Sequence, residues 1–238
     1  MQLINNNQSP QHIAIIMDGN RRWARKRLLP TNLGHKEGAQ RLEDIAKYCK
    51  KIGVKYLTVY AFSTENWKRS EEEVGYLMNL LADSIKDFDK RFEDDDIAIR
   101  LVGDINGLPP KLQDGIKHIE ERTKDKSGLT VNVAINYGGR AEIINAAKQL
   151  AEDYKSGKIN SLDNIDEAML SNYMYTKHCP DPDLIIRTAG EIRMSGFLTW
   201  QGVYSEMYFT NVLWPDFKEA ELDKAIEEFN NRKRNFGK

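Results

Sequence analysis

The sequence predicts an α/β fold in which a mainly parallel sheet is flanked by helices within a single domain. Strand-like and helix-like segments alternate along the 238 residues, and this alternation is typical of parallel sheets with helical crossovers. Polar or glycine-rich residues follow four of the expected strands directly. Open parallel sheets bind their ligands at these carboxyl ends.

Each expected strand is a short apolar run that ends at a polar or turn residue. The run at 12–17 stops at Asp18-Gly19, and the run at 97–102 stops at Gly103-Asp104. The run at 56–62 is rich in β-branched and aromatic residues, which favour strands. The six expected strands cover residues 12–17, 56–62, 97–102, 129–136, 184–187 and 206–209.

The segments between these strands carry apolar residues at three- and four-residue spacing, which indicates helices that bury one side. Pro109 stands near the start of one helix, where proline is well accepted. The acidic run at 93–96 is interpreted as a solvated turn. The expected helices, which should cover both faces of the sheet, span residues 36–51, 71–92, 109–124, 140–154, 166–175 and 219–234.

Composition narrows the functional classes. The formal net charge is −1, and nucleic acid is therefore a poor partner, because its binders carry a basic excess. Two well-separated cysteines, Cys49 and Cys179, argue against a disulfide framework or a zinc site and fit a reducing cytoplasm. No apolar run approaches the roughly 18 residues of a membrane span. Residues 1–11 are polar, and we expect a flexible tail before a single domain at 12–238.

The first loop after a strand has the chemistry of a diphosphate site. Gly19 allows the backbone to approach a ligand closely, and Asn20 and Arg21 supply hydrogen-bond donors. A helix that starts here would direct free N–H groups at phosphate. Because Asp18 would repel phosphate directly, its presence suggests a bridging Mg²⁺. The alternative is an ordinary turn with a capping aspartate.

The loop after the fifth strand offers two guanidinium forks and a hydroxyl, from Arg187, Arg193 and Ser195, which match phosphate oxygens. A salt-bridged surface loop is the alternative. His35, after Gly34, could donate to phosphate or be an ordinary capping histidine. The sequence has neither a phosphate-binding Gly-X4-Gly-Lys-Ser/Thr motif nor a Gly-X-Ser-X-Gly nucleophile elbow, which disfavours P-loop kinases and serine hydrolases.

Taken together, these loops resemble the cis-prenyltransferase family, typified by undecaprenyl diphosphate synthase. The resemblance runs from His12 to about Gly237, nearly the whole chain. The motifs that carry it are Asp18-Gly19-Asn20 with Arg22-Trp23, Gly34-His35, Tyr60-Ala61-Phe62-Ser63 through Asn66-Trp67, Asn136-Tyr137-Gly138-Gly139-Arg140, Arg187 through Ser195, Glu206-Met207-Tyr208-Phe209 and Leu213-Trp214-Pro215.

The resemblance implies a homodimer that condenses an allylic prenyl diphosphate with isopentenyl diphosphate and forms a cis double bond in each cycle. It implies Mg²⁺ as cofactor, with Asp18 and Glu206 as its ligands and with Asp18 and Asn66 as catalytic residues. The residues that it assigns to substrate binding are Gly19, Asn20, Arg21, Arg22, Trp23, His35, Ser63, Thr64, Glu65, Trp67, Arg69, Arg187, Arg193, Met194 and Ser195. Arg187, Arg193 and Ser195 would bind isopentenyl diphosphate.

The chemistry of the residues qualifies one of these roles. Asn66 matches a position assigned as proton acceptor, but an amide is a weak base. Asp18 or the diphosphate itself is a sounder acceptor, and Asn66 would instead orient the substrate by hydrogen bonds. The helix at 71–92 could wall an apolar tunnel for the growing chain, although its apolar side would equally serve as core.

The sequence departs from the family pattern at several positions. Thr31 stands where members often carry an arginine, so that one diphosphate contact is either missing or supplied by Arg25, Lys26 or Arg27. Arg21, Ser70, Gly196 and Gly202 also depart from common family residues and leave product length open. Two alternatives therefore remain: a short-chain or irregular prenyl diphosphate synthase, and a non-catalytic partner subunit. A long polyprenyl product would also imply transient contact with a membrane surface.

Overall fold

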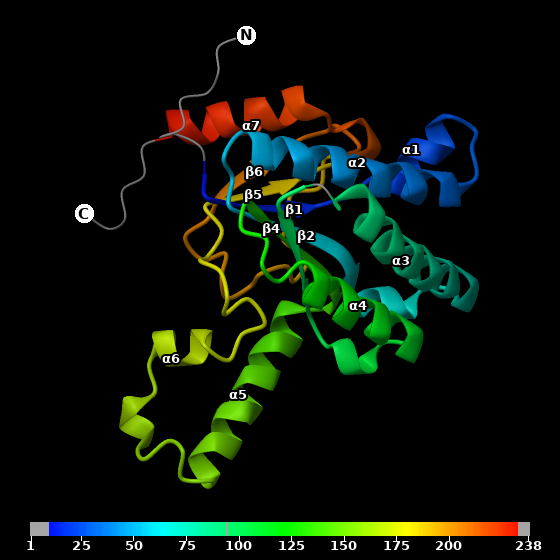
Figure 1. The fold of residues 1–238 in the computed structure, drawn as a ribbon. Coiled ribbons are helices and arrows are strands. Elements are labelled where there is room, and N and C mark those ends of the chain that lie inside the picture. Colours follow the sequence, from blue (N-terminus) through cyan, green and yellow to red (C-terminus); the bar gives the residue numbers. More distant parts are fainter. Residues whose placement is uncertain (1–9, 94, 233–238) are drawn as a thin grey trace.

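The computed structural model of the chain describes residues 10–93 and 95–232 and confirms the expected fold class. Six parallel strands form one sheet in the order β3-β4-β2-β1-β5-β6 (Figure 1). Residues 1–9 of the expected tail lie outside this description. Gln11 donates its backbone N–H to Asp183 Oδ2 over 2.7 Å. The strands are β1 (His12–Ile16), β2 (Tyr56–Ser63), β3 (Ile97–Val102), β4 (Leu129–Tyr137), β5 (Leu184–Arg187) and β6 (Glu206–Phe209).

The position of β1 in the sheet determines what can meet at its carboxyl end. It pairs with β2 on one side and β5 on the other, so that Ile16 lies opposite both Tyr60 and Arg187. All five residues of β1 are buried, as expected for a central strand of a parallel sheet. The loops that leave β1, β2 and β5 therefore emerge side by side at the sheet edge where the sequence predicted the ligand site.

Helices α2, α3, α4 and α7 pack with the strands in the larger of two apolar clusters. The smaller cluster, on the alternate strand residues Ala14 and Ile16, contains Phe197 and Leu198 from a coil segment instead of helical residues of the described chain. Helix α5 meets this face through buried Glu142, which accepts from the Tyr137 hydroxyl over 2.5 Å, so that the apolar packing here comes mainly from the coil segment. The helices are α1 (Asn20–Lys26), α2 (Thr31–Lys51), α3 (Glu71–Arg91), α4 (Pro110–Arg122), α5 (Gly139–Lys155), α6 (Glu167–Ser171) and α7 (Glu219–Asn231).

Two further features differ from the sequence-based expectation. Residues 20–26, expected as a loop, form α1, and α2 begins at Thr31 instead of residue 36. Glycine at 34 and 38 obscured this start, because glycine is a poor helix former.

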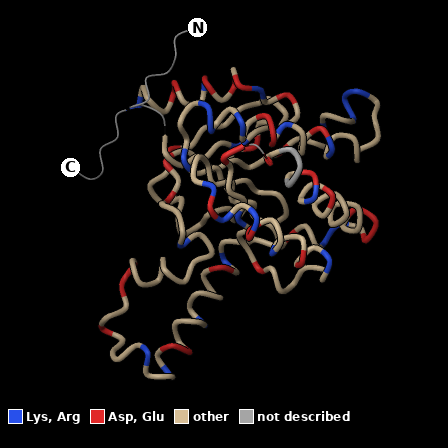
Figure 2. The backbone as a smooth tube through the Cα atoms, in the orientation of Figure 1, with Lys and Arg blue, Asp and Glu red and all other residues tan. Residues whose placement is uncertain are grey.

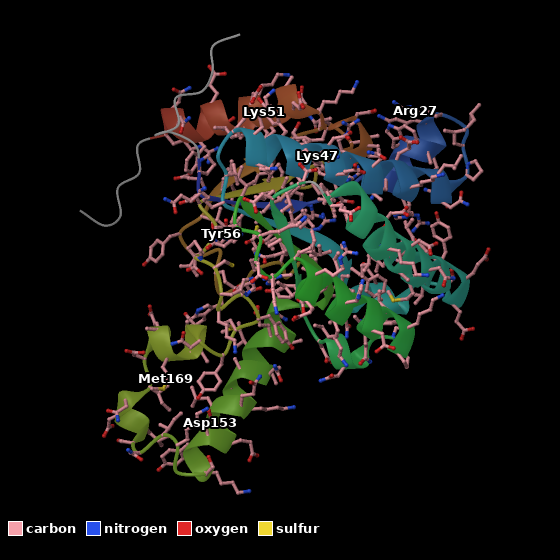
Figure 3. All side chains as sticks on the ribbon, in the orientation of Figure 1. Arg27, Lys47, Lys51, Tyr56, Asp153 and Met169 are labelled. Carbon is pink, nitrogen blue, oxygen red and sulfur yellow. The ribbon has the colours of Figure 1, made fainter. Side chains whose placement is uncertain are left out.

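Figure 3 labels Asp153 and Met169 on an arm formed by α5 and α6 that extends from the sheet. Single 3₁₀ turns occur at Thr64–Lys68, Ile105–Gly107, Leu162–Asn164 and Trp214–Asp216. Among the described residues, no helix combines the length and apolar composition that crossing a bilayer requires.

Hydrogen bonds between polar side chains connect β1, β2 and β4 at a distance from the carboxyl ends of the strands. His12 Nε2 lies 2.7 Å from Thr58 Oγ1, and the Asn132 amide donates to the same hydroxyl over 3.0 Å. His178 Nε2 lies 2.7 Å from Asn132 Oδ1. Burial lowers the pKa of His12 to about 4, against a hydrogen bond to the Pro180 carbonyl that raises it. Both histidines are therefore neutral in the folded protein near pH 7.

The burial of His12 predicts that the folded protein loses stability at acid pH. An unfolded histidine binds its proton below about pH 6.5, whereas folded His12 resists protonation down to about pH 4. Stability therefore falls as the pH drops through this window. We expect His12 to account for about 1–2 kcal/mol of the loss between pH 7 and pH 5. Urea unfolding at both pH values should show a smaller loss for His12→Gln than for the unsubstituted protein. An equal loss in His12→Gln would refute the assignment.

Candidate functional site

A cavity of about 830 Å³ opens at the carboxyl ends of β1, β2 and β5, where the sequence placed the ligand. Its floor is polar, and α1, the start of α2 and the segment after β5 contribute its walls. Six arginines and three carboxylates line it, which favours an anionic ligand. The lining residues are Ile16, Met17, Asp18, Gly19, Asn20, Arg21, Arg22, Arg25, His35, Tyr60, Ala61, Ser63, Glu65, Asn66, Arg69, Leu77, Arg187, Glu191, Arg193 and Ser195.

Gly19 allows α1 to start directly above the sheet. Its φ is +106°, and a Cβ there would lie 2.9 Å from Ala189 Cβ and 3.0 Å from a Leu213 methyl. Both the conformation and the space therefore require glycine. No side chain caps the start of α1, so that its first backbone N–H groups remain available to an anion.

Asp18 and Arg187 form the centre of the site. Arg187 Nη2 donates to Asp18 Oδ2 over 2.9 Å, and the Gly19 N–H donates to Asp18 Oδ1 over 3.0 Å. Arg187 Nη1 donates to Ser195 Oγ over 2.8 Å and also to the Arg193 carbonyl. The Arg187 side chain is only 5% exposed, whereas that of Asp18 is 36% exposed. One buried guanidinium thus joins the loop after β1 to the loop after β5, and the carboxylate remains accessible.

Four of the other five arginines share two carboxylates. Glu73 lies 3.4 Å from Arg21 and 3.1 Å from Arg69, measured between carboxylate oxygen and guanidinium nitrogen. Glu191 lies 3.7 Å from Arg22 and 2.5 Å from Arg193 in the same way. The four cations are therefore held around the cavity by ion pairs that an incoming anion can replace.

His35 presents an unused polar atom to this cavity. Its Nε2 is buried and has no hydrogen-bond partner within the described chain. Burial, and to a smaller extent the positive charge of Arg69, lowers the pKa of His35 to about 4. The imidazole is therefore neutral near pH 7, with one nitrogen ready to pair with a ligand.

The loop after β2 contributes Ser63, Glu65, Asn66 and Arg69 to the cavity. Asn66 Oδ1 accepts from the Ser63 backbone N–H over 3.1 Å, in a reciprocal capping arrangement of the turn. The amide oxygen of Asn66 is thus already engaged in holding the loop. This geometry suits a residue that orients a ligand.

Four expected binding residues, Trp23, Thr64, Trp67 and Met194, are absent from the cavity lining and make other contacts. Trp23 Nε1 donates to Asp216 over 2.8 Å, and Trp67 Nε1 donates to Asn136 over 2.7 Å. Thr64 packs against Gly138. Met194 packs in the smaller apolar cluster. These side chains position the loops that carry the polar groups.

The loop after β4 was expected on the functional edge, but it supports the neighbouring loop. Asn136 has a positive φ of 49°, and its amide donates to the Asp104 carbonyl over 2.9 Å while its oxygen accepts from Trp67. Residues 136–140 are absent from the cavity lining. The position of β4, one strand beyond β2, explains this distance.

Glu206 does not join Asp18 within the chain. It starts β6 opposite Leu184, whereas Arg187, which contacts Asp18, lies opposite Phe209. Glu206 therefore lies three residues before Phe209 along β6, a distance of about 10 Å. Its carboxylate accepts from Arg232 over 2.8 Å. Within this chain Glu206 lies away from Asp18, because β6 is parallel and presents its start to the opposite edge. Its assignment as the second Mg²⁺ ligand stays a prediction.

The structure also assigns residues that sequence reasoning left open or missed. Of Arg25, Lys26 and Arg27, only Arg25 lines the cavity, whereas Arg27 pairs with Asp216. Glu191 was not singled out, because a carboxylate among phosphate-binding arginines gives no signal of its own. The apolar lining residues Tyr60 and Leu77 were also missed as site residues.

Comparisons with known proteins point to a single family. A family profile described as "Putative undecaprenyl diphosphate synthase" matches residues 16–237. The isoprenyl transferase of Fusobacterium nucleatum is 52% identical over 228 residues, which cover 96% of both chains. That of Clostridium tetani is 49% identical over 228 residues, 96% of this chain and 89% of the relative.

Two solved structures share the fold. Lavandulyl diphosphate synthase from Lavandula x intermedia, in complex with dimethylallyl diphosphate, superposes with a TM-score of 0.91 at 36% identity and covers 98% of this chain and 100% of that chain. A "probable undecaprenyl diphosphate synthase" from Campylobacter jejuni gives a TM-score of 0.80 at 33% identity, with 99% and 100% coverage. The chain therefore belongs to the undecaprenyl diphosphate synthase family of prenyltransferases.

Proposed function

We propose that the chain condenses isopentenyl diphosphate with an allylic prenyl diphosphate, releases diphosphate and builds a cis-polyprenyl diphosphate, with residues 12–238 as one catalytic domain. The observation that carries this proposal is the accessible Asp18 carboxylate, which Arg187 holds inside a cavity lined by five further arginines. Such a site can accept two diphosphate groups and stabilise the charge that develops on one as its carbon–oxygen bond breaks.

The donor set of the cavity fits Mg²⁺. Within the described chain, no group of three or more His, Cys, Asp or Glu side chains could hold a metal, which argues against a cage made of protein groups alone. Mg²⁺ commonly takes one or two carboxylates and completes its coordination with phosphates and water. Asp18 would hold it, and the ion would supply charge stabilisation to the leaving diphosphate.

The protein groups divide the remaining work by position. Arg187, Arg193 and Ser195, on the segment from the end of β5, would bind isopentenyl diphosphate through charge-assisted hydrogen bonds. The amide groups at the start of α1, with Arg21, Arg22 and His35, would bind the allylic diphosphate. Asn66 would orient the reacting ends, while Asp18 or the departing diphosphate accepts the proton.

Apolar residues in the cavity wall support the proposal that the substrate carries a prenyl chain. Met17, Ala61 and Leu77 line the cavity beside its polar groups. Leu77 lies on α3, whose apolar side continues through Leu81 and Ile85 into the larger cluster. A prenyl tail would therefore pass from the diphosphate site toward the packed side of α3, where the same residues serve as core and as wall.

The homodimer is part of the proposal. β6 is an edge strand of the sheet, and the segment before it exposes Val203 by 68% and Tyr204 by 82%. Large exposed apolar side chains beside an open sheet edge favour a protein interface. A second copy of the chain is the partner that the family resemblance implies, and light scattering of the purified chain tests for it.

The specific observation that favours a second candidate, a short-chain or irregular synthase, is the close structural match to lavandulyl diphosphate synthase. The two candidates predict different products from radiolabelled isopentenyl diphosphate and an allylic primer. We expect chromatography to show a ladder that extends to long chains. A single short product would establish the second candidate, and no transfer by the purified chain would favour a non-catalytic subunit.

Loss of the Asp18 carboxylate should stop turnover. We expect Asp18→Ala and Asp18→Asn to lower kcat by at least about 10²-fold, because each removes a charge positioned at the reacting diphosphate. Asp18→Asn retains an acceptor for Arg187 and separates this effect from misfolding, which circular dichroism monitors. Asp153→Asn, on the arm formed by α5 and α6, should keep full activity. Near-normal turnover by Asp18→Asn would refute the catalytic role.

Removal of Glu191 should tighten diphosphate binding. Glu191 competes with a ligand for Arg22 and Arg193, and exposed ion pairs contribute up to about 1 kcal/mol. Glu191→Gln should therefore lower the Kd for inorganic diphosphate with Mg²⁺ by roughly fivefold in calorimetry. Glu221→Gln, which breaks the Lys224 ion pair on α7, is the matched control and should leave the Kd unchanged. Weaker binding in Glu191→Gln would mean that Glu191 supports the ligand instead of competing with it.

A further inference from the structure

The turn between α1 and α2, residues 25–30, combines features that the catalytic site does not explain. Leu28 at its tip is 95% exposed and has a positive φ of 56°. Leu29 and Leu33 are 38% and 39% exposed. A leucine in the left-handed region is strained, and this one gains no packing in return. Its side chain is therefore available to a surface outside the chain.

Cationic side chains surround these leucines. Arg25, Lys26 and Arg27 immediately precede Leu28 and are exposed. Arg27 lies over the Trp23 ring at 4.2 Å and pairs with Asp216 at 3.1 Å, which fixes the base of the turn. Arg25 and Lys26 have no ion-pair partner within residues 10–93 and 95–232. Figure 2 shows this basic group at the end of α1, and Figure 1 shows the turn projecting at the edge of the molecule.

We propose that the turn at residues 25–30 docks the protein on an anionic lipid bilayer, with Leu28 and Leu29 inserted among the acyl chains and Arg25 and Lys26 at the phosphate level. Apolar tips with flanking basic residues bind the membrane interface through both contributions. A bilayer fits better than a protein partner, because one turn offers far less than the roughly 1,000 Å² that a stable protein interface buries.

The position of the turn connects this surface to the reaction, and this step depends on the proposed function. Arg25 belongs both to the turn and to the cavity lining. A bilayer in contact with Leu28 would therefore lie beside the cavity mouth, where a long prenyl product can leave without crossing bulk water. The exposed Glu71 and Glu72 at the start of α3 would be repelled by anionic lipid and favour contact through the α1–α2 turn.

Vesicle flotation tests this docking without requiring enzyme activity. The full chain should bind phosphatidylglycerol vesicles more tightly than phosphatidylcholine vesicles, and higher salt should weaken the binding by screening. The double substitution Leu28→Gly with Leu29→Ser should lower the partition coefficient at least about tenfold, because it removes the inserted side chains. Lys26→Glu should lower binding to anionic vesicles by at least about fivefold.

Two controls separate docking from folding and from self-association. Leu28→Gly alone should raise the thermal midpoint, because glycine accepts the positive φ, while vesicle binding falls. Leu162→Ser removes a leucine that is 58% exposed on the arm formed by α5 and α6 and should leave vesicle binding unchanged.

Three outcomes would overturn the proposal: no preference for anionic vesicles, full vesicle binding by the double variant, or a change of oligomeric state in that variant by light scattering. Transfer to a short water-soluble primer should be unchanged in the turn variants. Loss of prenyl transfer in every form of the chain would refute the proposed function but not the docking.

Discussion

The ion pair between Asp18 and Arg187 is the interaction on which the site depends. A guanidinium as buried as that of Arg187 is stable only if its donors find acceptors. Asp18, Ser195 and the Arg193 carbonyl accept from its two Nη nitrogens, and each comes from a loop beyond the sheet, whereas its buried Nε has no hydrogen-bond partner among the described residues. The parallel pairing of β1 with β5 brings these loops together. The same contacts that satisfy a buried charge therefore set the positions of the groups that would handle diphosphate.

The remaining arginines show how a strongly cationic cavity can exist in a chain of formal net charge −1. Glu73 and Glu191 each pair with two arginines that belong to different segments. These carboxylates lower the mutual repulsion of the guanidinium groups while keeping them near the cavity. When a diphosphate oxygen takes the place of a carboxylate, one ion pair replaces another. The free and the diphosphate-bound protein therefore need not differ greatly in free energy.

Much of the site could be predicted from the sequence because parallel topology places every strand end at one edge. Asp18, Ser63 and Arg187 follow three apolar runs directly, and those runs are adjacent strands in the sheet. Strand order was not predictable, and for this reason the loop after β4 was expected on the cavity. The separation of Glu206 from Asp18 within the chain has a related cause: a residue at the beginning of a parallel strand faces the opposite edge from a residue that follows one.

The failure to predict α1 has a different physical origin. A helix of seven residues is too short to be stable alone, so its own sequence contains little signal. It is held by close approach to α2, where any Cβ at Gly34 would clash with the Asn20 carbonyl and any Cβ at Gly38 with the Asn20 amide oxygen. The two glycines are poor helix formers by local propensity, but they allow α1 to pack closely against α2. Because α1 carries Arg21 and Arg22 on the cavity and leads into the turn at residues 25–30, this glycine contact positions both the diphosphate-binding groups and the surface proposed to meet the bilayer.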